Sequence, residues 1–288
     1  MMPKLPVWGH RRSHDSRAVV TGAGSGIGRA FALELVRRGG QVVCADIDRA
    51  RAEETVEMIV ADGGTAWAVR CDVSDRDQVD SLAVTASERF ERPVSLVINN
   101  AGVGIGGSPI GDIPLEDWDW ALGINLWGVV YGCHVFAPIL RETGGGIINV
   151  GSTASFAAAP LMGPYNVSKA AVLALSETLS AELSGTGVTV SVLCPTFVKT
   201  NVARDGRISG PSTELAATMM KWTGYSADRI ARTTLDAHDA GRLYVVPQID
   251  ARLIWELKRH APTAYTRSLG RIGRFSGLSR AATPTKGA

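Results

Sequence analysis

The sequence predicts an α/β protein built on one parallel sheet with helices packed on both of its faces. Two observations support this prediction: short β-branched runs alternate with longer helical stretches, and these runs show little polar alternation. Val188–Cys194 is typical, because a strand that is covered on both faces needs apolar residues along its whole length. Parallel strands require crossover connections, which are almost always right-handed. We therefore expect a single layered domain.

The alternation can be followed element by element. The expected strands are Ala18–Thr21, Gln41–Asp46, Thr65–Cys71, Ser95–Asn99, Gly146–Gly151, Thr189–Cys194 and Leu243–Val246. The expected helices between them are Gly26–Arg38, Arg49–Ala61, Arg76–Phe90, Leu115–Leu140 and Tyr165–Leu183. The sequence contains no internal repeat, so we expect one domain over residues 18–262, flanked by a basic extension at 1–17 and a basic tail at 263–288.

Composition and charge limit the possible functions. The chain has 288 residues, of which 45% are hydrophobic and 20% charged, an ordinary globular balance. Its net charge of +2 does not indicate a nucleic-acid partner. The tail is a local exception, because from Ala251 onward Glu256 alone opposes the Lys and Arg residues. This tail can be a solvated, partly disordered segment, or it can bind a membrane surface or an acidic partner.

No targeting, membrane-spanning or metal-binding pattern is found in the sequence. No run of 18 apolar residues occurs, and residues 1–17 lack the apolar core of a signal peptide. The cysteines at 44, 71, 133 and 194 lie far apart in apolar runs, without the spacing of metal ligands or of a disulfide framework. We expect buried thiols in a reducing, cytoplasmic environment, and no metal.

A glycine-rich turn directly follows the first expected strand. It runs Thr21-Gly-Ala-Gly-Ser-Gly-Ile-Gly28 and opens the first helix. Glycine lets the backbone turn sharply and approach a diphosphate, which then meets the helix N-terminus. The residues expected to hold a dinucleotide here are Gly22, Ser25, Gly26, Ile27 and Gly28. Tight turns also use glycine for structural reasons alone, so the turn by itself only suggests such a site.

Asp46 ends the second expected strand, 18 residues after Gly28. A carboxylate at this place can accept hydrogen bonds from an adenosine ribose diol and would repel a 2′-phosphate, which favours NAD over NADP. Two alternatives stay open. Asp46 could instead cap the helix that begins at Arg49, and Arg49 or Arg51 could bind a phosphate.

The next two strands also end in residues that suit a dinucleotide. Asp72 and Val73 follow the third strand, where a carboxylate could contact adenine, and Asn99-Asn-Ala101-Gly102 ends the fourth. Small residues at the fourth strand let the backbone pass close to a cofactor. Turn chemistry explains either segment alone, so their order along the chain is the stronger observation.

Tyr165 and Lys169 stand four residues apart, so both side chains leave the same face of a helix. Free tyrosine titrates near pH ~10, and acid/base work at neutral pH needs a pKa roughly 2–3 units lower, or about 3–4 kcal/mol. One positive charge at about 4 Å supplies roughly 4 kcal/mol at an effective dielectric of 20. The pair is therefore a plausible proton-transfer device, although a helix with an exposed lysine and a half-buried tyrosine gives the same spacing.

These motifs occur in an order that closely resembles the short-chain dehydrogenase/reductase family. The matching residues are Thr21–Gly28, Asp46, Asp72, Asn99–Gly102, Asn125, Ser152, Tyr165, Lys169, Pro195 and Thr200, and the resemblance covers about Ala18 to Thr200. It implies a Rossmann-type, doubly wound sheet of seven parallel strands. It also implies nicotinamide-dependent oxidation of an alcohol or reduction of a carbonyl, by a homodimer or homotetramer.

The resemblance assigns the catalytic roles to four residues. Tyr165 resembles the general acid/base, and Lys169 the residue that lowers the pKa of this tyrosine and hydrogen-bonds the nicotinamide ribose. Ser152, 13 residues before Tyr165, resembles the hydroxyl that polarises the substrate oxygen. Asn125 resembles the residue that holds a water in a proton relay to Lys169. The hydride chemistry belongs to the cofactor, so the protein need only place a proton donor and a polarising hydroxyl.

The chain departs from the family pattern after the sixth strand. The family often has Pro-Gly there, whereas this chain has Pro195-Thr196, followed by Val198 and Thr200 where the carboxamide would be held. A side chain at Thr196 could narrow the nicotinamide pocket or alter the hinge of a lid. We expect that lid at about 201–225, although an ordinary surface helix and loop would also fit.

The substrate is poorly specified by the sequence. Several apolar residues lie near the catalytic motifs or in the expected lid and could line a pocket or simply pack in the core: Phe156, Leu161, Met162, Phe197, Met219, Met220 and Trp222. We expect a small-molecule substrate, a hydrophobic secondary alcohol or ketone of steroid, terpenoid or lipid type. An NADP-dependent carbonyl reductase, a non-catalytic dinucleotide sensor and a methyltransferase are the alternatives.

Overall fold

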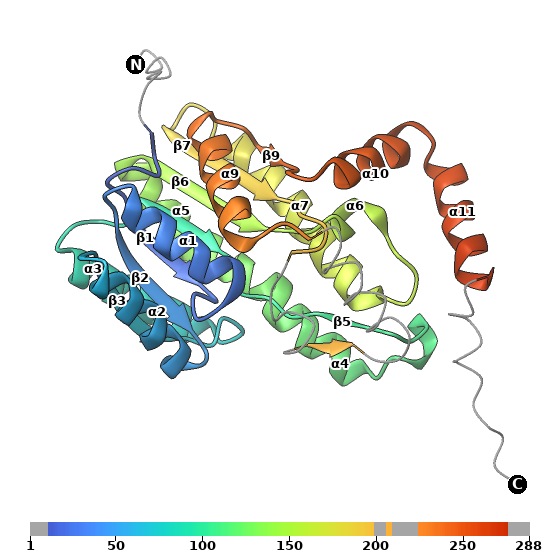
Figure 1. Cartoon of the computed structure of the whole chain (residues 1–288), viewed down its shortest axis with the longest axis horizontal. Helices are drawn as coiled ribbons and strands as arrows, with labels where there is room; N and C mark the ends of the chain where they lie inside the picture. Colours follow the sequence, from blue (N-terminus) through green and yellow to red (C-terminus); the bar gives the residue numbers. More distant parts are fainter. Residues whose placement is uncertain (1–10, 199–205, 209–223, 276–288) are drawn as a thin grey trace, which may run out of the picture.

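The computed structural model describes residues 11–198, 206–208 and 224–275, and it centres on a seven-stranded parallel sheet (Figure 1). The strands are β1 (Arg17–Thr21), β2 (Gln41–Asp46), β3 (Thr65–Arg70), β4 (Leu96–Asn99), β6 (Gly145–Val150), β7 (Val188–Leu193) and β9 (Tyr244–Val245). They lie in the order β3-β2-β1-β4-β6-β7-β9, and all adjacent pairs are parallel. The predicted doubly wound sheet is confirmed.

The direction of winding reverses between β1 and β4. From β1 the chain moves outward through β2 and β3, then returns to β4 and continues through β6, β7 and β9 on the other side. Val20 in β1 pairs with Cys44 on one side and with Ile98 on the other, so the three carboxyl ends meet at one edge. Such a switch point opens a crevice at that edge, where ligands of open α/β sheets bind.

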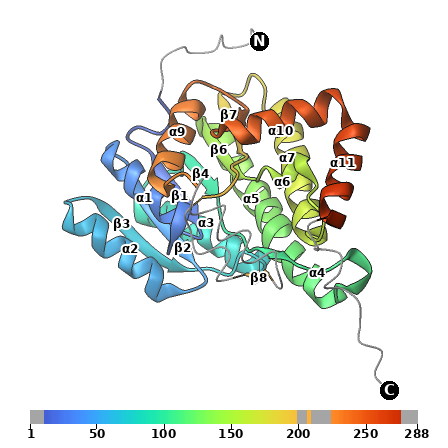
Figure 2. The ribbon, with the colours of Figure 1, turned by 45° about the vertical axis from the view of Figure 1, so that its right-hand side comes forward.

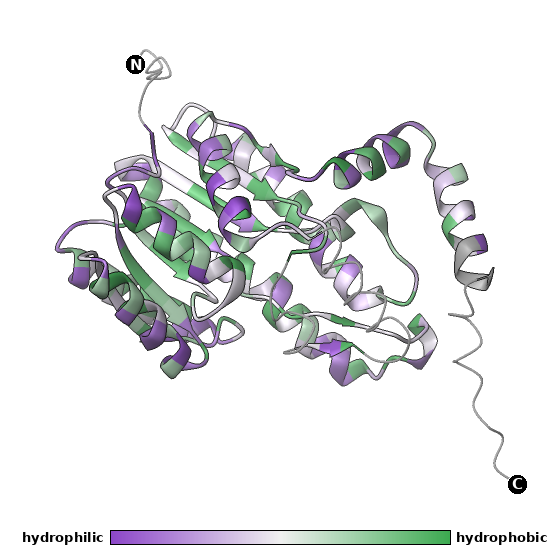
Figure 3. Ribbon diagram, in the orientation of Figure 1, coloured by the Kyte–Doolittle hydropathy of each residue, from purple (hydrophilic) through white to green (hydrophobic). Residues whose placement is uncertain are grey.

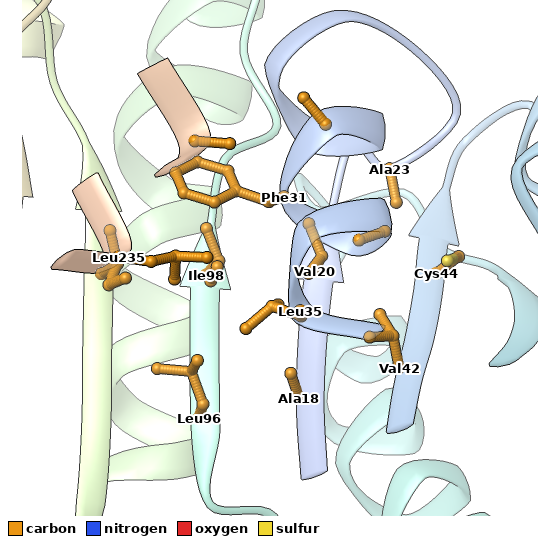
Figure 4. Packing of buried hydrophobic residues seen from close by; sticks show 14 of the residues in the cluster. Ala18, Val20, Ala23, Phe31, Leu35, Val42, Cys44, Leu96, Ile98 and Leu235 are labelled. Carbon is orange, nitrogen blue, oxygen red and sulfur yellow. The ribbon is translucent and has the colours of Figure 1, made fainter. Parts of the chain in front are cut away.

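Helices cover both faces of the sheet. One face carries α1 (Gly26–Arg37), α2 (Arg49–Ala61) and α9 (Ala227–Asp239), and the other carries α3 (Arg76–Phe90), α5 (Gly128–Thr143) and α7 (Gly163–Glu182). Successive strand residues enter opposite cores, as Val19 and Val20 do. Phe31 and Leu35 of α1 pack over Val20 and Ile98 (Figure 4). Burial on both faces is why the strands are apolar throughout.

The long helix expected at Leu115–Leu140 is interrupted. It consists of α4 (Leu115–Leu122), a π-helical segment η2 (Gly123–Trp127) and α5. A π turn widens the helix by one residue per turn, and such turns are common at functional sites. Hydrophobic periodicity does not report them, because the apolar pattern continues across η2.

The helical run Leu115–Thr143 is, within the described part of the chain, the one helix long and apolar enough to cross a membrane by length and composition. A helix in the core of a globular protein passes the same test. Val129, Phe136 and Leu140 in this run are buried against the sheet. Packing in the core therefore accounts for its apolar character.

Short elements lie beside the carboxyl edge of the sheet. They are β5 (Ile105–Gly106), η1 (Ile110–Asp112), α6 (Ala154–Ala157) and β8 (Arg207–Ile208), which pairs with β5 in parallel. Most of the expected lid at 201–225 lies outside the described residues. Its described portion at Arg207 forms an ion pair with Asp117 and places its guanidinium 4.1 Å from the centre of the Trp120 ring.

Part of the N-terminal extension and part of the C-terminal tail pack as defined structure within the described residues. The backbone N–H and hydroxyl of Ser13 donate to the Asp239 carboxylate at 2.9 and 2.6 Å, which ties the end of the N-terminal extension to α9. After β9 the chain forms α10 (Ile249–His260) and α11 (Pro262–Phe275), seen most clearly in Figure 2. The segment that we expected to be a solvated tail is thus helical up to Phe275. Its charge suggested a tail, but Tyr265 and Leu269 stand at helical spacing.

Candidate active site

The turn after β1 is built so tightly that side chains would not fit. Gly22 and Gly26 have φ angles of +63° and +54°, which favour glycine. A Cβ on Gly28 would lie 2.0 Å from the carbonyl oxygen of Gly22, so α1 starts in direct contact with the turn. The side-chain amide of Asn100 donates to the carbonyls of Thr21 and Gly22 at 2.8 and 3.2 Å and holds the turn against β4.

The N-terminus of α1 is suited to an anion. Ser25 occupies the capping position without a side-chain hydrogen bond, and the first turn contains no acidic residue. By contrast α2 and α3 begin at Asp48 and Asp75, whose side chains accept hydrogen bonds from the first helical amides. The free amides and positive end of the α1 dipole, next to a glycine turn, fit the diphosphate of a dinucleotide.

Asp46 lies beside this turn. Its Oδ2 accepts from the N–H of Gly24 at 2.8 Å and its Oδ1 from the N–H of Asp48 at 3.0 Å. Asp48, not Asp46, caps α2, so the alternative role for Asp46 as a helix cap is wrong. Arg51 forms an ion pair with Asp48 at 3.3 Å, and Arg49 one with Glu53 at 2.8 Å. Both arginines that could bind a 2′-phosphate therefore have a carboxylate partner.

The residues after β3 are held by their own turn. The Asp72 carboxylate accepts from the N–H and hydroxyl of Ser74 at 2.9 and 2.7 Å, so local turn chemistry accounts for its orientation. Val73 is buried, and a Cβ on Gly128 would lie 2.7 Å from its Cγ2. Val73 therefore fixes the distance between this turn and the start of α5.

The Asn99 side chain lies inside the core. Its side-chain amide is buried and donates to the Oδ1 of Asn149 at 2.8 Å, and Asn149 donates in turn to the hydroxyl of Ser176 at 3.0 Å. This network joins β4, β6 and α7 inside the core. The side chain that faces the glycine turn is that of Asn100, which we did not single out. Residues in a strand point alternately to opposite faces, and this rule could have separated the two.

Gly102 brings the fourth strand against two predicted catalytic residues. A Cβ at Gly102 would lie 3.0 Å from the Oδ1 of Asn125 and 3.3 Å from the Nζ of Lys169. Asn125, in η2, accepts from the N–H of Val103 at 2.8 Å and donates to the carbonyl of Val103 at 2.9 Å. Positions far apart in the sequence are therefore in contact at this point.

Lys169 is fixed at both ends. Its Nζ donates to the Val150 carbonyl at 2.9 Å, and its own backbone carbonyl accepts from the Ser155 hydroxyl at 2.7 Å. Its exposed fraction is 4%, which excludes the reading of an exposed lysine on a surface helix. Burial lowers the pKa of Lys169 to about 8, because the charged form loses its hydration.

Tyr165 is half-buried, and its hydroxyl hydrogen-bonds the Ser152 hydroxyl. Burial raises the pKa of Tyr165 above its ordinary value, while the hydrogen bond with Ser152 acts in the opposite direction. The Nζ of Lys169 is 5.9 Å from the centre of the Tyr165 ring and is directed to Val150. The lowering of the Tyr165 pKa that we expected from Lys169 is therefore not present in this conformation.

Comparison with known proteins identifies the family. Residues 16–208 match the family model for short chain dehydrogenases. The chain belongs to the short-chain dehydrogenase/reductase family.

Individual relatives agree with this assignment. A "Probable oxidoreductase EphD" of Mycobacterium tuberculosis is 41% identical over 202 residues, 69% of this chain but only 34% of that protein, so this dehydrogenase spans about a third of that relative. A 1-deoxy-11-beta-hydroxypentalenate dehydrogenase of Streptomyces exfoliatus is 35% identical over 82% of this chain and 84% of its own. A solved short-chain dehydrogenase/reductase of Burkholderia phymatum, in complex with NAD, has a TM-score of 0.81 and 32% identity, and covers 96% of this chain and 99% of its own.

The segment between Ser152 and Tyr165 is strained in this dehydrogenase. Ala158 and Leu161 have φ angles of +52° and +62°, in the left-handed region that side chains other than glycine rarely adopt. Such strain costs about 1–3 kcal/mol per residue and is concentrated at functional sites. Neither position carries glycine or asparagine, so the strain could not be predicted from these residues.

The residues after β7 are attached to α10. The Thr196 hydroxyl donates to Asp250 at 3.2 Å, and its N–H donates to the Oε1 of Gln248, also at 3.2 Å. Gln248 is buried and donates back to the Phe197 carbonyl at 3.3 Å. Pro195 accepts from the N–H of Thr153, which connects this loop to the segment that carries Ser152. Val198 is buried, and Thr200 lies outside the described residues.

The apolar residues expected near the substrate are placed only in part. Phe156, Leu161, Met162 and Phe197 are half-buried. The Phe156 ring stacks on Trp255 of α10 with 5.8 Å between ring centres, so packing against α10 accounts for it. Met219, Met220 and Trp222 lie outside the described residues.

Gly102→Ala tests the contact between the fourth strand and the catalytic residues. We expect turnover to fall about 10–100-fold, because the new methyl group displaces Asn125 and Lys169 and small misplacements are costly in catalysis. The measurement is steady-state oxidation of an alcohol that the unmodified enzyme accepts, together with thermal unfolding. Gly111→Ala is the matched control, since its Cβ would meet nothing within 4 Å. Equal activity of the two variants would contradict the contact.

Proposed function

We propose that this dehydrogenase interconverts a hydrophobic secondary alcohol and its ketone with NAD(H), using Tyr165 as general acid/base. The observation that carries the proposal is the convergence at Gly102, where Asn125 and Lys169 both lie within contact of one glycine. The hydrogen bond between Ser152 and Tyr165 lies at the same edge of the sheet, because Ser152 follows the carboxyl end of β6 as Gly102 follows that of β4. A sensor that only bound a dinucleotide would have no need for a tyrosine hydroxyl beside the Ser152 hydroxyl.

The protein's part in the reaction is to move one proton and hold one oxygen. The nicotinamide supplies or accepts the hydride. In ketone reduction the Tyr165 hydroxyl donates its proton to the substrate oxygen, and in alcohol oxidation it takes this proton back. Ser152 donates a hydrogen bond to the same oxygen and polarises it. Lys169 would hydrogen-bond the ribose of a bound nicotinamide, and it would lower the pKa of Tyr165 if its ammonium turned toward the ring.

The charges near the glycine turn support NAD over NADP. A 2′-phosphate on the adenosine ribose would lie next to the Asp46 carboxylate, and the repulsion would oppose binding. The ion pairs of Arg49 with Glu53 and of Arg51 with Asp48 reduce their value as phosphate ligands. An NADP-dependent carbonyl reductase is the alternative within the family.

The substrate class rests on a relative and on composition. The pentalenate relative, by its name, acts on a hydroxylated terpenoid acid, and this dehydrogenase covers 84% of its length. Half-buried apolar side chains flank the catalytic segment at Leu161, Met162 and Phe197. Both observations favour a substrate of steroid, terpenoid or lipid type over a sugar.

Tyr165→Phe removes only the hydroxyl that we assign to proton transfer. Turnover should fall by about 10²–10⁴ while NADH affinity stays nearly unchanged, since general acid/base catalysis contributes about this much. Stopped-flow absorbance gives the first quantity and NADH fluorescence the second. Tyr131→Phe, which changes a half-buried tyrosine on α5, is the control. Substantial remaining activity in Tyr165→Phe would refute the assigned role.

Asp46→Ala should relax the preference for NAD over NADP. Because a like-charge contact is removed, the ratio of kcat/KM for the two cofactors should shift roughly tenfold or more toward NADP. Steady-state kinetics with each cofactor measures this ratio. Asp62→Ala, at an exposed residue just after α2, controls for loss of one negative charge. An unaltered ratio would contradict the assignment of Asp46 to the adenosine ribose.

A panel of alcohols and ketones tests the substrate class. With purified protein and both cofactors, kcat/KM should be highest for large apolar secondary alcohols, because apolar groups gain free energy on leaving water. Polyols and small sugars of equal hydroxyl reactivity serve as the comparison. If these polar substrates are preferred, the hydrophobic assignment is wrong while the catalytic one stands. Dinucleotide binding without oxidation of any alcohol would favour the sensor.

A further inference from the structure

Helix α10 exposes a stripe of apolar side chains. Ile249, Leu253 and Leu257 recur every fourth residue and therefore lie on one side of the helix, with exposed fractions of 67%, 59% and 57%. We call these three residues the apolar stripe. Single exposed apolar residues such as Val84 on α3 are ordinary, but three in line on one helix call for a partner.

The opposite side of α10 packs against the rest of the domain. Ala251 is fully buried, and Trp255 packs against Phe156 and Tyr244 with ring centres 5.8 and 5.1 Å apart. Helix α10 is therefore anchored to the domain through one face. Among the residues that the structure describes, the apolar stripe stays exposed on the other side of the helix.

Helices α10 and α11 together carry an excess of basic residues. Between Ile249 and Phe275 the sequence has six Lys or Arg residues against two acidic ones. Arg252 and Arg259 on α10, and Arg267 and Arg271 one turn apart on α11, are exposed. Helix α11 carries no acidic residue. A helical unit that combines an apolar face with a strong basic excess has the character of an interfacial membrane-binding segment.

The two helices form one unit at the side of the domain. The Nζ of Lys258 lies 5.4 Å from the centre of the Tyr265 ring and donates to the Thr266 hydroxyl at 3.4 Å, joining α10 to α11. Figure 1 shows both helices beyond the end of the sheet that carries β9, and Figure 3 shows hydrophobic residues on α10. A flat surface could therefore approach this side without meeting the helices that cover the sheet.

We propose that α10 and α11 dock this dehydrogenase on an anionic lipid surface. The apolar stripe enters the boundary between headgroups and acyl chains, and the arginines pair with lipid phosphates. The charge favours this occupant over a second copy of the chain, because a contact between two such units brings like charges together. The attachment is peripheral and reversible, since no segment of α10 or α11 has the length or composition of a membrane span.

Vesicle co-sedimentation tests the proposal with the purified full-length chain. Vesicles of phosphatidylcholine mixed with phosphatidylglycerol should bind the protein, and vesicles of phosphatidylcholine alone should not. The double variant Leu253→Asp/Leu257→Asp should weaken binding more than about tenfold, since it places charge where apolar groups insert. Arg267→Glu/Arg271→Glu should weaken it about 25-fold or more, at about fivefold per basic residue. Added salt should release the wild-type protein, because it screens the charges.

Matched variants control for charge and exposure. Val60→Asp alters an exposed apolar residue on α2, and Arg89→Glu/Arg92→Glu makes the same charge change at exposed positions near the end of α3. Both should bind anionic vesicles like the wild type. NADH binding and thermal unfolding report whether each variant is folded. If a stripe variant does not fold, the release of the wild-type protein from anionic vesicles by salt tests the proposal instead.

Three results would overturn the proposal. The first is equal binding to neutral and anionic vesicles, or none to either. The second is unchanged vesicle binding by the stripe variant. The third is a wild-type protein that does not bind vesicles, together with a stripe variant whose molar mass by light scattering differs from that of the wild type. This result would show that the apolar stripe is a contact between copies of the chain.

Discussion

The whole site depends on one close approach of the backbone, at Gly102. The chain leaving β4 passes so close to Asn125 and Lys169 that a Cβ on Gly102 would lie 3.0 and 3.3 Å from their side-chain atoms. Asn125 then holds the next residue, Val103, through both its N–H and its carbonyl. These two hydrogen bonds join a helix to a loop. They require the Asn125 side chain to project from the helix toward the loop, and the π-helical segment η2 provides that position. β4, η2 and α7 are thereby held in fixed relation.

The burial of Lys169 works against the role that its spacing suggests. Desolvation lowers the pKa of Lys169 to about 8, and the same burial raises the pKa of Tyr165. The electrostatic argument from the sequence assumed a charge about 4 Å from the phenol. In the structure the Lys169 Nζ donates a hydrogen bond to the Val150 carbonyl and lies 5.9 Å from the centre of the Tyr165 ring. A charge at that distance would be strong enough to lower the Tyr165 pKa. Whether it does so depends on which acceptor the Lys169 ammonium faces, and the spacing of the two residues does not determine this.

The parts of the fold that depend on repeated apolar contacts were predictable. Gln41–Asp46 and Arg49–Ala61 have the expected bounds, because runs covered on both sides and stretches of helical period each leave a clear pattern. The separate positions of the Asn99 and Asn100 side chains were not predicted, because the motif was read as a block and not residue by residue. The left-handed φ of Ala158 and Leu161 could not be predicted, since tertiary contacts impose it against local preference.

Thr196, where the chain departs from the family pattern, is linked to helix α10. A glycine after Pro195 would leave this loop with backbone contacts alone, whereas the Thr196 hydroxyl reaches Asp250 in the first turn of α10. Gln248, just before α10, is buried between the Thr196 N–H and the Phe197 carbonyl. The loop also connects through Pro195 to the Ser152 segment. A displacement of α10 would therefore reach Ser152 through two hydrogen-bonded steps, and the position of this helix is part of the geometry of the active site.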